Sequence, residues 1–538
     1  MVRAVMPECP LTFALGPHDV VLCLGPADGE VVQAVWARCT GEQTLLVCAV
    51  AHCLELPIES ARVHYFFGPD PALVQHWLLT HAALYLTVRA VLVKDEAAIR
   101  AAPAAYARLE AGILEAIRLA DVNAITLCSL GRATLHNVLT NLPRLGPLPG
   151  VHRLAGLGRG YPAIVLGGGP SLRPQIPDVQ VRQQQALVIA TDTVAQVCQA
   201  ADIAPDLLCT LDPQPINAQK LGGWRDAQTP LVLTPHAPPA LFTTFPGPLV
   251  LSDIGSPLTT FFGAVLPAKG HVLAQAPSVV HLAVNLAVHL GCAEIWLVGV
   301  DFCLPETPQG VGPLELSLEN VESSRIVYER QPDGRTVATL PTFQTFRDVL
   351  RRTLAQHPQV RVFQTSAQAL DLGVPVRGLW QGAWRAPSDG PGQGLAKVQW
   401  QQVVARVLAA PDPFAPVAFA TRRGQLQQMV RQTWRQTRRL TARLDWLTSH
   451  QGAARFETTL LQVERAVAQL EADPLLPLLA PHAQHLDLYL AAPEQAAIDR
   501  LPAGDERLQR RLERALPYYQ GLLEVLETAR AALDAPAN

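Results

Sequence analysis

The stretch YPAIVLGGGPSLRPQIP, residues 161–177, decides the fold. Its apolar run ends in three glycines, a proline and a serine. A short apolar run with such an ending is typical of a buried β-strand that leads into a turn. Glycine permits positive φ angles and lets a backbone approach a ligand closely. Two interpretations are therefore open: a structural turn between strand and helix, or a loop that holds a phosphate.

Six further apolar runs follow along the middle of the chain, separated by helical patterns. Continuous apolar strands that alternate with helices indicate a mostly parallel sheet buried on both faces. We therefore expect an α/β fold with a Rossmann-like sheet in a central domain. The seven predicted strands are 163–167, 186–190, 206–210, 231–234, 249–252, 295–299 and 360–364.

The flanking regions have a different pattern. Three strand-like runs, 20–26, 44–51 and 90–95, and a helical pattern over 104–127 predict a mixed α/β N-terminal domain. Apolar residues spaced three and four apart after residue 455 predict a C-terminal helical bundle, whose last helix we expect Pro517 to kink or end. The expected domains are 1–150, 151–385 and 395–538.

Composition narrows the function classes. The chain has 538 residues, too many for one hydrophobic core, and its net charge of -3 gives no support to nucleic-acid binding. The most apolar window, 278–300, carries histidine and glutamate, so we expect no membrane span and a cytoplasmic protein. None of the ten cysteines forms a C-x-x-C pair, so buried thiols are expected rather than a disulfide framework.

Polar and flexible residues follow the predicted strands. In an open parallel sheet, ligands bind beyond the carboxyl ends of the strands. We therefore expect the active or binding site at this edge. The residues there are Gly167, Gly168, Gly169, Pro170, Ser171, Asp192, Asp212, His236, Asp253, Asp301 and Thr365.

The glycine loop favours an anion site by its chemistry. Ser171 is a candidate N-cap for the next helix, whose free N–H groups would attract a phosphate. The loop has neither the Walker pattern nor the G-x-G-x-x-G pattern. Asp192 and Asp212 suit a ribose hydroxyl, a base edge or a metal, or else cap a helix or turn. No D-x-D cluster is present, so metal dependence, with Mg²⁺ as the candidate ion, stays open.

An apolar helix is predicted over 279–290, with Ser278 as its cap and Gly291 at its end. His281, Asn285 and His289 form one stripe along it. The stripe is interpreted either as a metal or substrate face or as a solvated or interface face.

The central residues resemble the Maf proteins, motility-associated factors that glycosylate flagellin. The resemblance rests on AIVLGGGPSL, on the strands that end in Asp192 and Asp212, and on PSVVHLAVNLAVHLGCAEIWLVGVDF, residues 277–302. A third block, GRTVATLPTFQTFRDVL with VRVFQTSAQALDLGVPV, is also similar, and the resemblance covers about 130–385. The same loop resembles those of bacterial sialyltransferases and of the MptE-like 6-hydroxymethylpterin diphosphokinases.

The resemblance implies a CMP-activated nonulosonic acid as donor and a Ser or Thr hydroxyl of flagellin as acceptor. It implies that Gly167 to Ser171 hold the phosphate and that Asp192 and Asp212 contact the cytidine or ribose. Ser278 and Asp301 would lie near the sugar. The flanking domains would dock flagellin.

The sequence departs from the family after Asp301, where a histidine is usual. The segment VDFCLPETPQGVGPLELSLEN has none, so Asp301 and Glu306 are the candidates for the catalytic base. Two alternatives to a transferase stay open: an MptE-like diphosphokinase that uses ATP and Mg²⁺, and a non-catalytic nucleotide-sugar-binding relative.

Seven arginines occupy residues 421–444 before the first acid, Asp445. This run is interpreted either as a docking face for a partner or acidic surface, or as a solvated face of the bundle.

Overall fold

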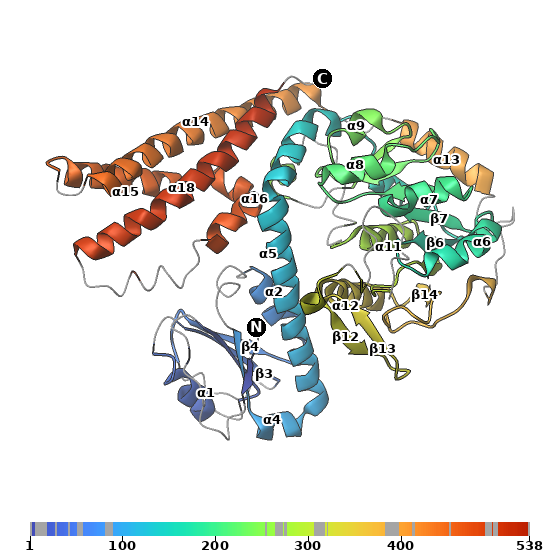
Figure 1. Cartoon of the computed structure of the whole chain (residues 1–538), viewed down its shortest axis with the longest axis horizontal. Helices are drawn as coiled ribbons and strands as arrows, with labels where there is room; N and C mark the ends of the chain where they lie inside the picture. Colours follow the sequence, from blue (N-terminus) through green and yellow to red (C-terminus); the bar gives the residue numbers. More distant parts are fainter. Residues whose placement is uncertain are drawn as a thin grey trace. The chain divides into compact units, whose positions relative to one another are not determined.

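The computed structural model confirms the expected α/β fold with a helical C-terminal region (Figure 1). It has a seven-stranded sheet in the middle of the chain, a five-stranded sheet near the N-terminus and a two-stranded hairpin. The residues described are 3–5, 15, 19–26, 29–40, 43–50, 58–80, 90–252, 256–263, 273, 277–305, 318–319, 321–381, 397–410, 415–450, 453–489, 498 and 504–535.

The seven-stranded sheet is parallel throughout, with the order β10-β9-β8-β7-β6-β11-β14. Successive strands run outward from β6 on one side, whereas β11 and β14 lie on its other side. The order therefore reverses between β6 and β11. All seven strand predictions are confirmed. The strands are β6 (Pro162–Leu166), β7 (Leu187–Thr191), β8 (Leu207–Cys209), β9 (Leu231–Leu233), β10 (Leu249–Leu251), β11 (Glu294–Val298) and β14 (Arg361–Gln364).

Helices between these strands complete the core of the sheet. The helix predicted at 279–290 is α11 (Val279–His289), whose residues are mostly buried against β6, β7 and β8. Gly291 follows it with φ +81, as expected at a helix C-terminus. The others are α6 (Leu172–Arg182), α7 (Ala195–Ala200), α8 (Pro215–Leu221), α9 (Leu241–Thr244), α10 (Pro257–Phe261), α12 (Pro341–Ala355) and α13 (Lys397–Ala409).

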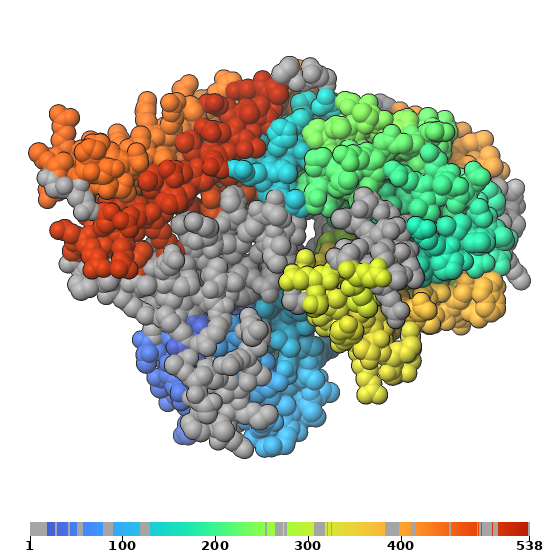
Figure 2. All heavy atoms as spheres, viewed as in Figure 1, coloured from blue at the N-terminus to red at the C-terminus, as the bar shows by residue number. Residues whose placement is uncertain are grey.

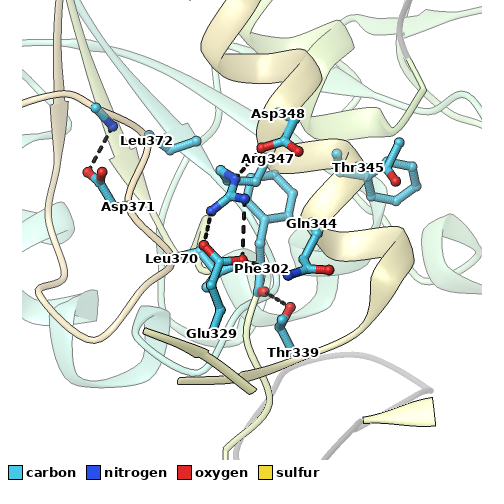
Figure 3. Close-up of polar contacts among 12 residues, drawn as sticks. Phe302, Glu329, Thr339, Gln344, Thr345, Arg347, Asp348, Leu370, Asp371 and Leu372 are labelled. Atoms are coloured by element: carbon cyan, nitrogen blue, oxygen red, sulfur yellow. Dashed lines mark hydrogen bonds and ion pairs between the residues drawn. The ribbon is translucent and has the colours of Figure 1, made fainter. Parts of the chain in front are cut away.

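An antiparallel hairpin of β12 (Val327–Arg330) and β13 (Thr336–Thr339) lies beside α12. Its tip, residues 332–336, is exposed and projects at the surface (Figure 2). Figure 3 shows the contacts that fix the hairpin to α12. The Arg347 guanidinium lies 2.5 Å from the Glu329 carboxylate, and the Gln344 amide donates to the same carboxylate at 2.7 Å. Burial acts to raise the pKa of Glu329, but Arg347 and Gln344 outweigh it and hold that pKa below its usual value.

The N-terminal sheet is also parallel, with the order β1-β5-β2-β3-β4. Three strands were predicted, β2 (Val20–Leu24), β3 (Thr44–Ala49) and β5 (Ala90–Lys94). Two were missed, β1 (Arg3–Val5) and β4 (Val63–Phe67). The helices here are α1 (Gly29–Trp36), α2 (Ala72–Thr80), α4 (Glu96–Ala101) and α5 (Pro103–Leu145).

The C-terminal region is helical, as expected. Its helices are α14 (Pro416–Ser449), α15 (Phe456–Glu471), α16 (Leu476–Tyr489) and α18 (Asp505–Asp534). Of the two outcomes expected at Pro517, a kink or an end, the helix does not end there, because α18 continues to Asp534 with Leu522, Val525 and Leu526 buried. In the arginine run, Arg423 donates to the carbonyl of Leu533 and Arg431 pairs with Asp534, so these two cations bind the C-terminus of α18.

Contacts divide the chain into two compact units. One comprises residues 1–131, 432–476 and 480–527, and the other comprises 132–431, 477–479 and 528–538. The domain limits given from sequence stay a prediction. No helix in the described part of the chain is both long and apolar enough to cross a membrane. Among the described cysteines, six are buried free thiols and Cys303 is partly exposed.

Candidate functional site

The glycine loop follows β6 at the point where the strand order reverses, which is where open parallel sheets bind ligands. It packs directly on the end of β11. Gly167 N–H donates to the Val298 carbonyl at 2.8 Å, and Gly169 N–H donates to the Gly299 carbonyl at 2.7 Å. A Cβ on either loop glycine would lie under 3.0 Å from the Gly299 oxygen. The glycines therefore allow two backbones to pass closely.

The positive φ at this close approach belongs to Gly299, not to the loop. Gly299 has φ +66, whereas Gly167, Gly168 and Gly169 are not among the positive-φ glycines. The N–H groups of Gly167 and Gly169 already donate to carbonyls at the end of β11, and Pro170 has no N–H. Gly168 N–H has no hydrogen-bond partner among the residues that the structure describes. It is the loop donor available to a ligand.

Asp301, which follows the neighbouring strand β11, accepts hydrogen bonds from the end of the loop. Its Oδ2 accepts the Ser171 N–H at 2.8 Å, and its Oδ1 accepts the Ser171 hydroxyl at 2.7 Å. Ser171 occupies the N-cap position of α6, as predicted, but its side chain makes no cap hydrogen bond, because that hydroxyl donates to Asp301 instead. Burial raises the pKa of Asp301, and the two Ser171 donors act in the opposite direction. The other base candidate, Glu306, and the edge residue Asp253 lie outside the described residues.

The two predicted nucleotide-contacting aspartates are in different situations. Asp192 is 2% exposed and accepts the Thr210 hydroxyl at 2.8 Å, which ties the end of β7 to the end of β8. Burial raises its pKa, opposed by Lys220 and Thr210. Asp212 is half-buried and accepts the Gln214 N–H at 3.1 Å, so it forms a turn of its own. Asp212 is therefore the more accessible carboxylate.

Ser278 and His281 form a pair at the N-terminus of α11. The Ser278 hydroxyl lies 2.7 Å from His281 Nδ1, and His281 Nε2 lies 2.9 Å from the Phe346 carbonyl oxygen. His281 is fully buried, and burial lowers its pKa to about 4. The interpretation of a solvated stripe is wrong for His281. His289 likewise contacts a carbonyl, that of Val151 at 3.0 Å.

Two asparagines of α5 were missed as site-building residues. Asn137 Nδ2 donates to the carbonyls of Pro213 and His236, both at 2.9 Å. Asn141 Nδ2 donates to the carbonyls of Pro235 and Ala237 at 3.0 and 2.8 Å. They fix the loops that follow β8 and β9. Their signal in the sequence was two amides four residues apart on one face of the predicted helical pattern.

Asn217 of α8 is a third residue that sequence reasoning missed. Its side chain is fully buried, and its Nδ2 donates to the Asp212 carbonyl at 3.0 Å. Its Oδ1 has no hydrogen-bond partner among the described residues. Buried acceptors are rarely left unpaired in proteins, so this oxygen is a candidate contact for a ligand group that donates. Within the described residues, no three His, Cys, Asp or Glu side chains gather as a metal site.

The pairing of Asp301 with Ser171 predicts a difference between two substitutions. Asp301→Ala removes both acceptors and is expected to lower the free energy of unfolding by about 2–3 kcal/mol. Asp301→Asn is expected to stay within about 1 kcal/mol, because its amide oxygen accepts the N–H and its amide nitrogen donates to the hydroxyl. Urea unfolding measures both. Equal losses in the two variants would show that the charge, rather than the hydrogen bonds, holds the loop.

Two comparisons with known proteins find similarities. Residues 136–307 match the family described as 6-hydroxymethylpterin diphosphokinase MptE-like, which confirms the predicted MptE-like central region. The structure is similar to that of a MAf glycosyltransferase from Magnetospirillum magneticum AMB-1, with a TM-score of 0.60 and 15% sequence identity over 97% of this chain and 80% of the other. At that identity the likeness establishes the fold. No curated protein matches the sequence.

Proposed function

We propose that this chain, which carries an MptE-like domain in residues 136–307, is a Maf-type glycosyltransferase. It moves a nonulosonic, sialic-acid-like sugar from a CMP-activated donor to a Ser or Thr hydroxyl of flagellin. The observation that carries the proposal is the glycine loop after β6, held at the reversal of strand order by Asp301, which follows β11. The fold shared with a MAf glycosyltransferase supports the same activity.

The loop residues, Gly167 to Ser171, are assigned to the donor phosphate. The assignment is based on the Gly168 N–H, because this loop donor has no hydrogen-bond partner in the described part of the chain. As the bond between the anomeric carbon and the phosphate oxygen breaks, negative charge grows on the leaving CMP. A preorganised N–H beside the first turn of α6 stabilises that charge.

Asp212 is assigned to the ribose hydroxyls, because its carboxylate is half-buried at the edge of the sheet. Asp192 is assigned to the same nucleotide site in an indirect role, because it accepts the hydroxyl of Thr210 and holds that residue in place. Asp301 and Glu306 are the acidic candidates for the base that accepts the acceptor proton. Both oxygens of Asp301 already accept hydrogen bonds from Ser171. Mg²⁺ is proposed as an optional component only.

The family match favours a second candidate function, a pterin diphosphokinase. That reaction moves a diphosphate from ATP to a hydroxymethyl group and uses Mg²⁺ to neutralise the phosphates. A non-catalytic relative that binds a nucleotide sugar is the third. All three use the loop as a phosphate site, so they differ in the nucleotide they bind and in turnover.

A thermal-shift screen with CMP, UDP, AMP and ATP, each with and without Mg²⁺, separates these candidates. We expect CMP to raise the melting temperature without Mg²⁺, since saturation at a hundredfold excess over Kd adds about 2.7 kcal/mol of stability. Stabilisation by ATP with Mg²⁺ alone would overturn the transferase and favour the diphosphokinase. Binding of CMP without release of CMP from any CMP-nonulosonic acid would favour the non-catalytic relative.

A pair of aspartate variants controls this screen. Asp212 and Asp226 both accept a backbone N–H two residues on, and asparagine keeps such a turn. Asp226 lies before β9, at the opposite edge of the sheet. Asp212→Asn is expected to weaken CMP about tenfold or more, through loss of a charged hydrogen bond, while Asp226→Asn leaves CMP binding unchanged.

A further inference from the structure

Glycosyl transfer to a hydroxyl requires a group that takes the hydroxyl proton. In the described part of the chain, the buried carboxylates at the strand edge are occupied: Asp301 by Ser171 and Asp192 by Thr210. The Ser278–His281 pair at the N-terminus of α11 has a different arrangement, because Ser278 is half-buried whereas His281 is fully buried.

The pair lies at the same edge of the sheet as the glycine loop. Helix α11 leads into the parallel strand β11 and packs on β6 and β7, so its N-terminus lies toward the carboxyl ends of these strands. The His281 ring centroid is 6.3 Å from that of Phe302, the residue after Asp301. The Phe302 carbonyl in turn accepts the Thr339 hydroxyl at 2.7 Å, which fixes this segment to the hairpin (Figure 3).

The hydrogen bonds determine which ring nitrogen carries the proton. The Phe346 carbonyl can only accept, so His281 Nε2 is the protonated nitrogen that donates to it. Nδ1 is then the acceptor, and the Ser278 hydroxyl donates to it at 2.7 Å. The lowered pKa, about 4, keeps the ring neutral at neutral pH. A serine hydroxyl polarised by a neutral histidine whose other nitrogen is anchored is the arrangement of an activated hydroxyl.

We propose that Ser278 and His281 form a proton relay that deprotonates the acceptor hydroxyl of the transfer reaction. The relay rests on the proposed function. It assigns the role of base to a residue pair instead of Asp301 or Glu306.

The step balances as follows. The acceptor oxygen bonds to the anomeric carbon as the bond from that carbon to the phosphate oxygen breaks, and CMP leaves with the electron pair. The acceptor proton passes to Ser278 Oγ while the Ser278 proton passes to His281 Nδ1. The imidazolium so formed keeps its Nε2–H on the Phe346 carbonyl. Its positive charge forms as negative charge appears on CMP, and each charge stabilises the other in a site of low dielectric.

If Ser278 and His281 only stabilise the start of α11, substitutions that preserve the helix start should preserve the rate of transfer. Ser278 is the N-cap residue and His281 occupies the third helical position, which are the two positions of a capping box, although the Ser278 side chain makes no cap hydrogen bond here. Glutamine is a favoured residue at that third position. His281→Gln therefore places a residue that suits the helix start and can still donate to the Phe346 carbonyl, but it cannot take up a proton.

The test measures CMP release from the CMP-nonulosonic acid that the wild-type chain uses fastest, chosen among the N-acetylneuraminic, pseudaminic and legionaminic acid donors. His281→Gln and Ser278→Ala are expected to lose about a hundredfold or more in rate, as removal of acid–base catalysis does. CMP affinity, measured by thermal shift, is expected to stay within about twofold, because neither side chain is assigned to the phosphate. Ser278→Thr keeps the hydroxyl and is expected to retain most of the rate.

A rate for Ser278→Ala within about threefold of wild type would overturn the relay, since proton transfer by a side chain contributes far more. If His281→Gln fails to fold, the comparison of Ser278→Ala with Ser278→Thr decides alone. Absence of CMP binding in the wild-type chain overturns the proposed function, and the relay with it. Normal CMP binding and turnover with an unaffected Ser278→Ala overturns the relay only.

Discussion

Replacing Gly299 with alanine is expected to lower the free energy of unfolding by about 2–5 kcal/mol, from a left-handed backbone and overpacking together. Gly299 has φ +66, a conformation that residues with a Cβ adopt at a cost. The added methyl group would also lie under 3.0 Å from the Gly167 carbonyl oxygen and 2.9 Å from Leu172 Cβ. Neither neighbour is the end of a flexible side chain, so the strands β6 and β11 must separate.

Urea unfolding checks this expectation, with Gly223→Ala as the control. Gly223 also lies in the central part of the chain, but nothing stands within 4 Å of an added Cβ and its φ is ordinary. Its substitution is expected to change stability by less than about 1 kcal/mol. A loss for Gly299→Ala no larger than that of the control would show that the two strands are not held as closely as described. Because the glycine loop rests on Gly299, we also expect CMP to lose its stabilising effect in this variant.

The central sheet could be predicted because its strands are buried on both faces. Such strands appear in the sequence as unbroken apolar runs, and all seven were found. The strand β4, with the sequence VHYFF, was missed because four of its five residues are half-exposed and a histidine in its second position interrupts the apolar run. The strand β1, at the edge of its sheet, has three residues, too few to show any period.

The sequence predicted which residues lie at the candidate site, but it did not predict the hydrogen bonds between them. Sequence reasoning placed Ser171 and Asp301 at one edge, yet their mutual hydrogen bonds join residues 130 positions apart and depend on the strand order. His281 was placed on a helix stripe because periodicity shows which residues share a face. Periodicity does not show that Phe302 and Phe346 pack over that face. Asn137 and Asn141 bind carbonyls of loops that only the fold brings near them.

A buried ion pair holds α13 on the central sheet and gives the second large prediction. Lys397 Nζ lies 2.9 Å from Asp206 Oδ2, and the two side chains are 9% and 0% exposed. Lys397 also donates to the carbonyls of Gln183 and Ala186, while Asp206 accepts the Val188 N–H at 2.8 Å and the Gln401 amide at 3.3 Å. Trp400, three residues after Lys397, is buried in the same core as the sheet.

Lys397→Met is expected to lower the free energy of unfolding by about 3–5 kcal/mol at neutral pH, because it leaves a buried carboxylate without its cation. The double variant Lys397→Met, Asp206→Asn is expected to lose less than the sum of the two single variants, since it leaves no charge behind. Arg510→Met is the control, because its pair with Glu506 is exposed, at 55% and 66%, and such pairs contribute under about 1 kcal/mol.

The loss in Lys397→Met is also expected to depend on pH with a definite sign. Burial raises the pKa of Asp206 above 3.8, and Lys397 opposes that rise, so removing Lys397 raises the folded-state pKa further. A carboxyl with a raised folded-state pKa binds its proton more readily in the folded chain than in the unfolded chain. Its destabilising effect is therefore greatest above the folded-state pKa and shrinks as pH falls toward the unfolded value. Urea unfolding of wild type and variant at neutral and mildly acidic pH measures this, and a stability deficit that grows on acidification would contradict the assignment of the buried charge to Asp206.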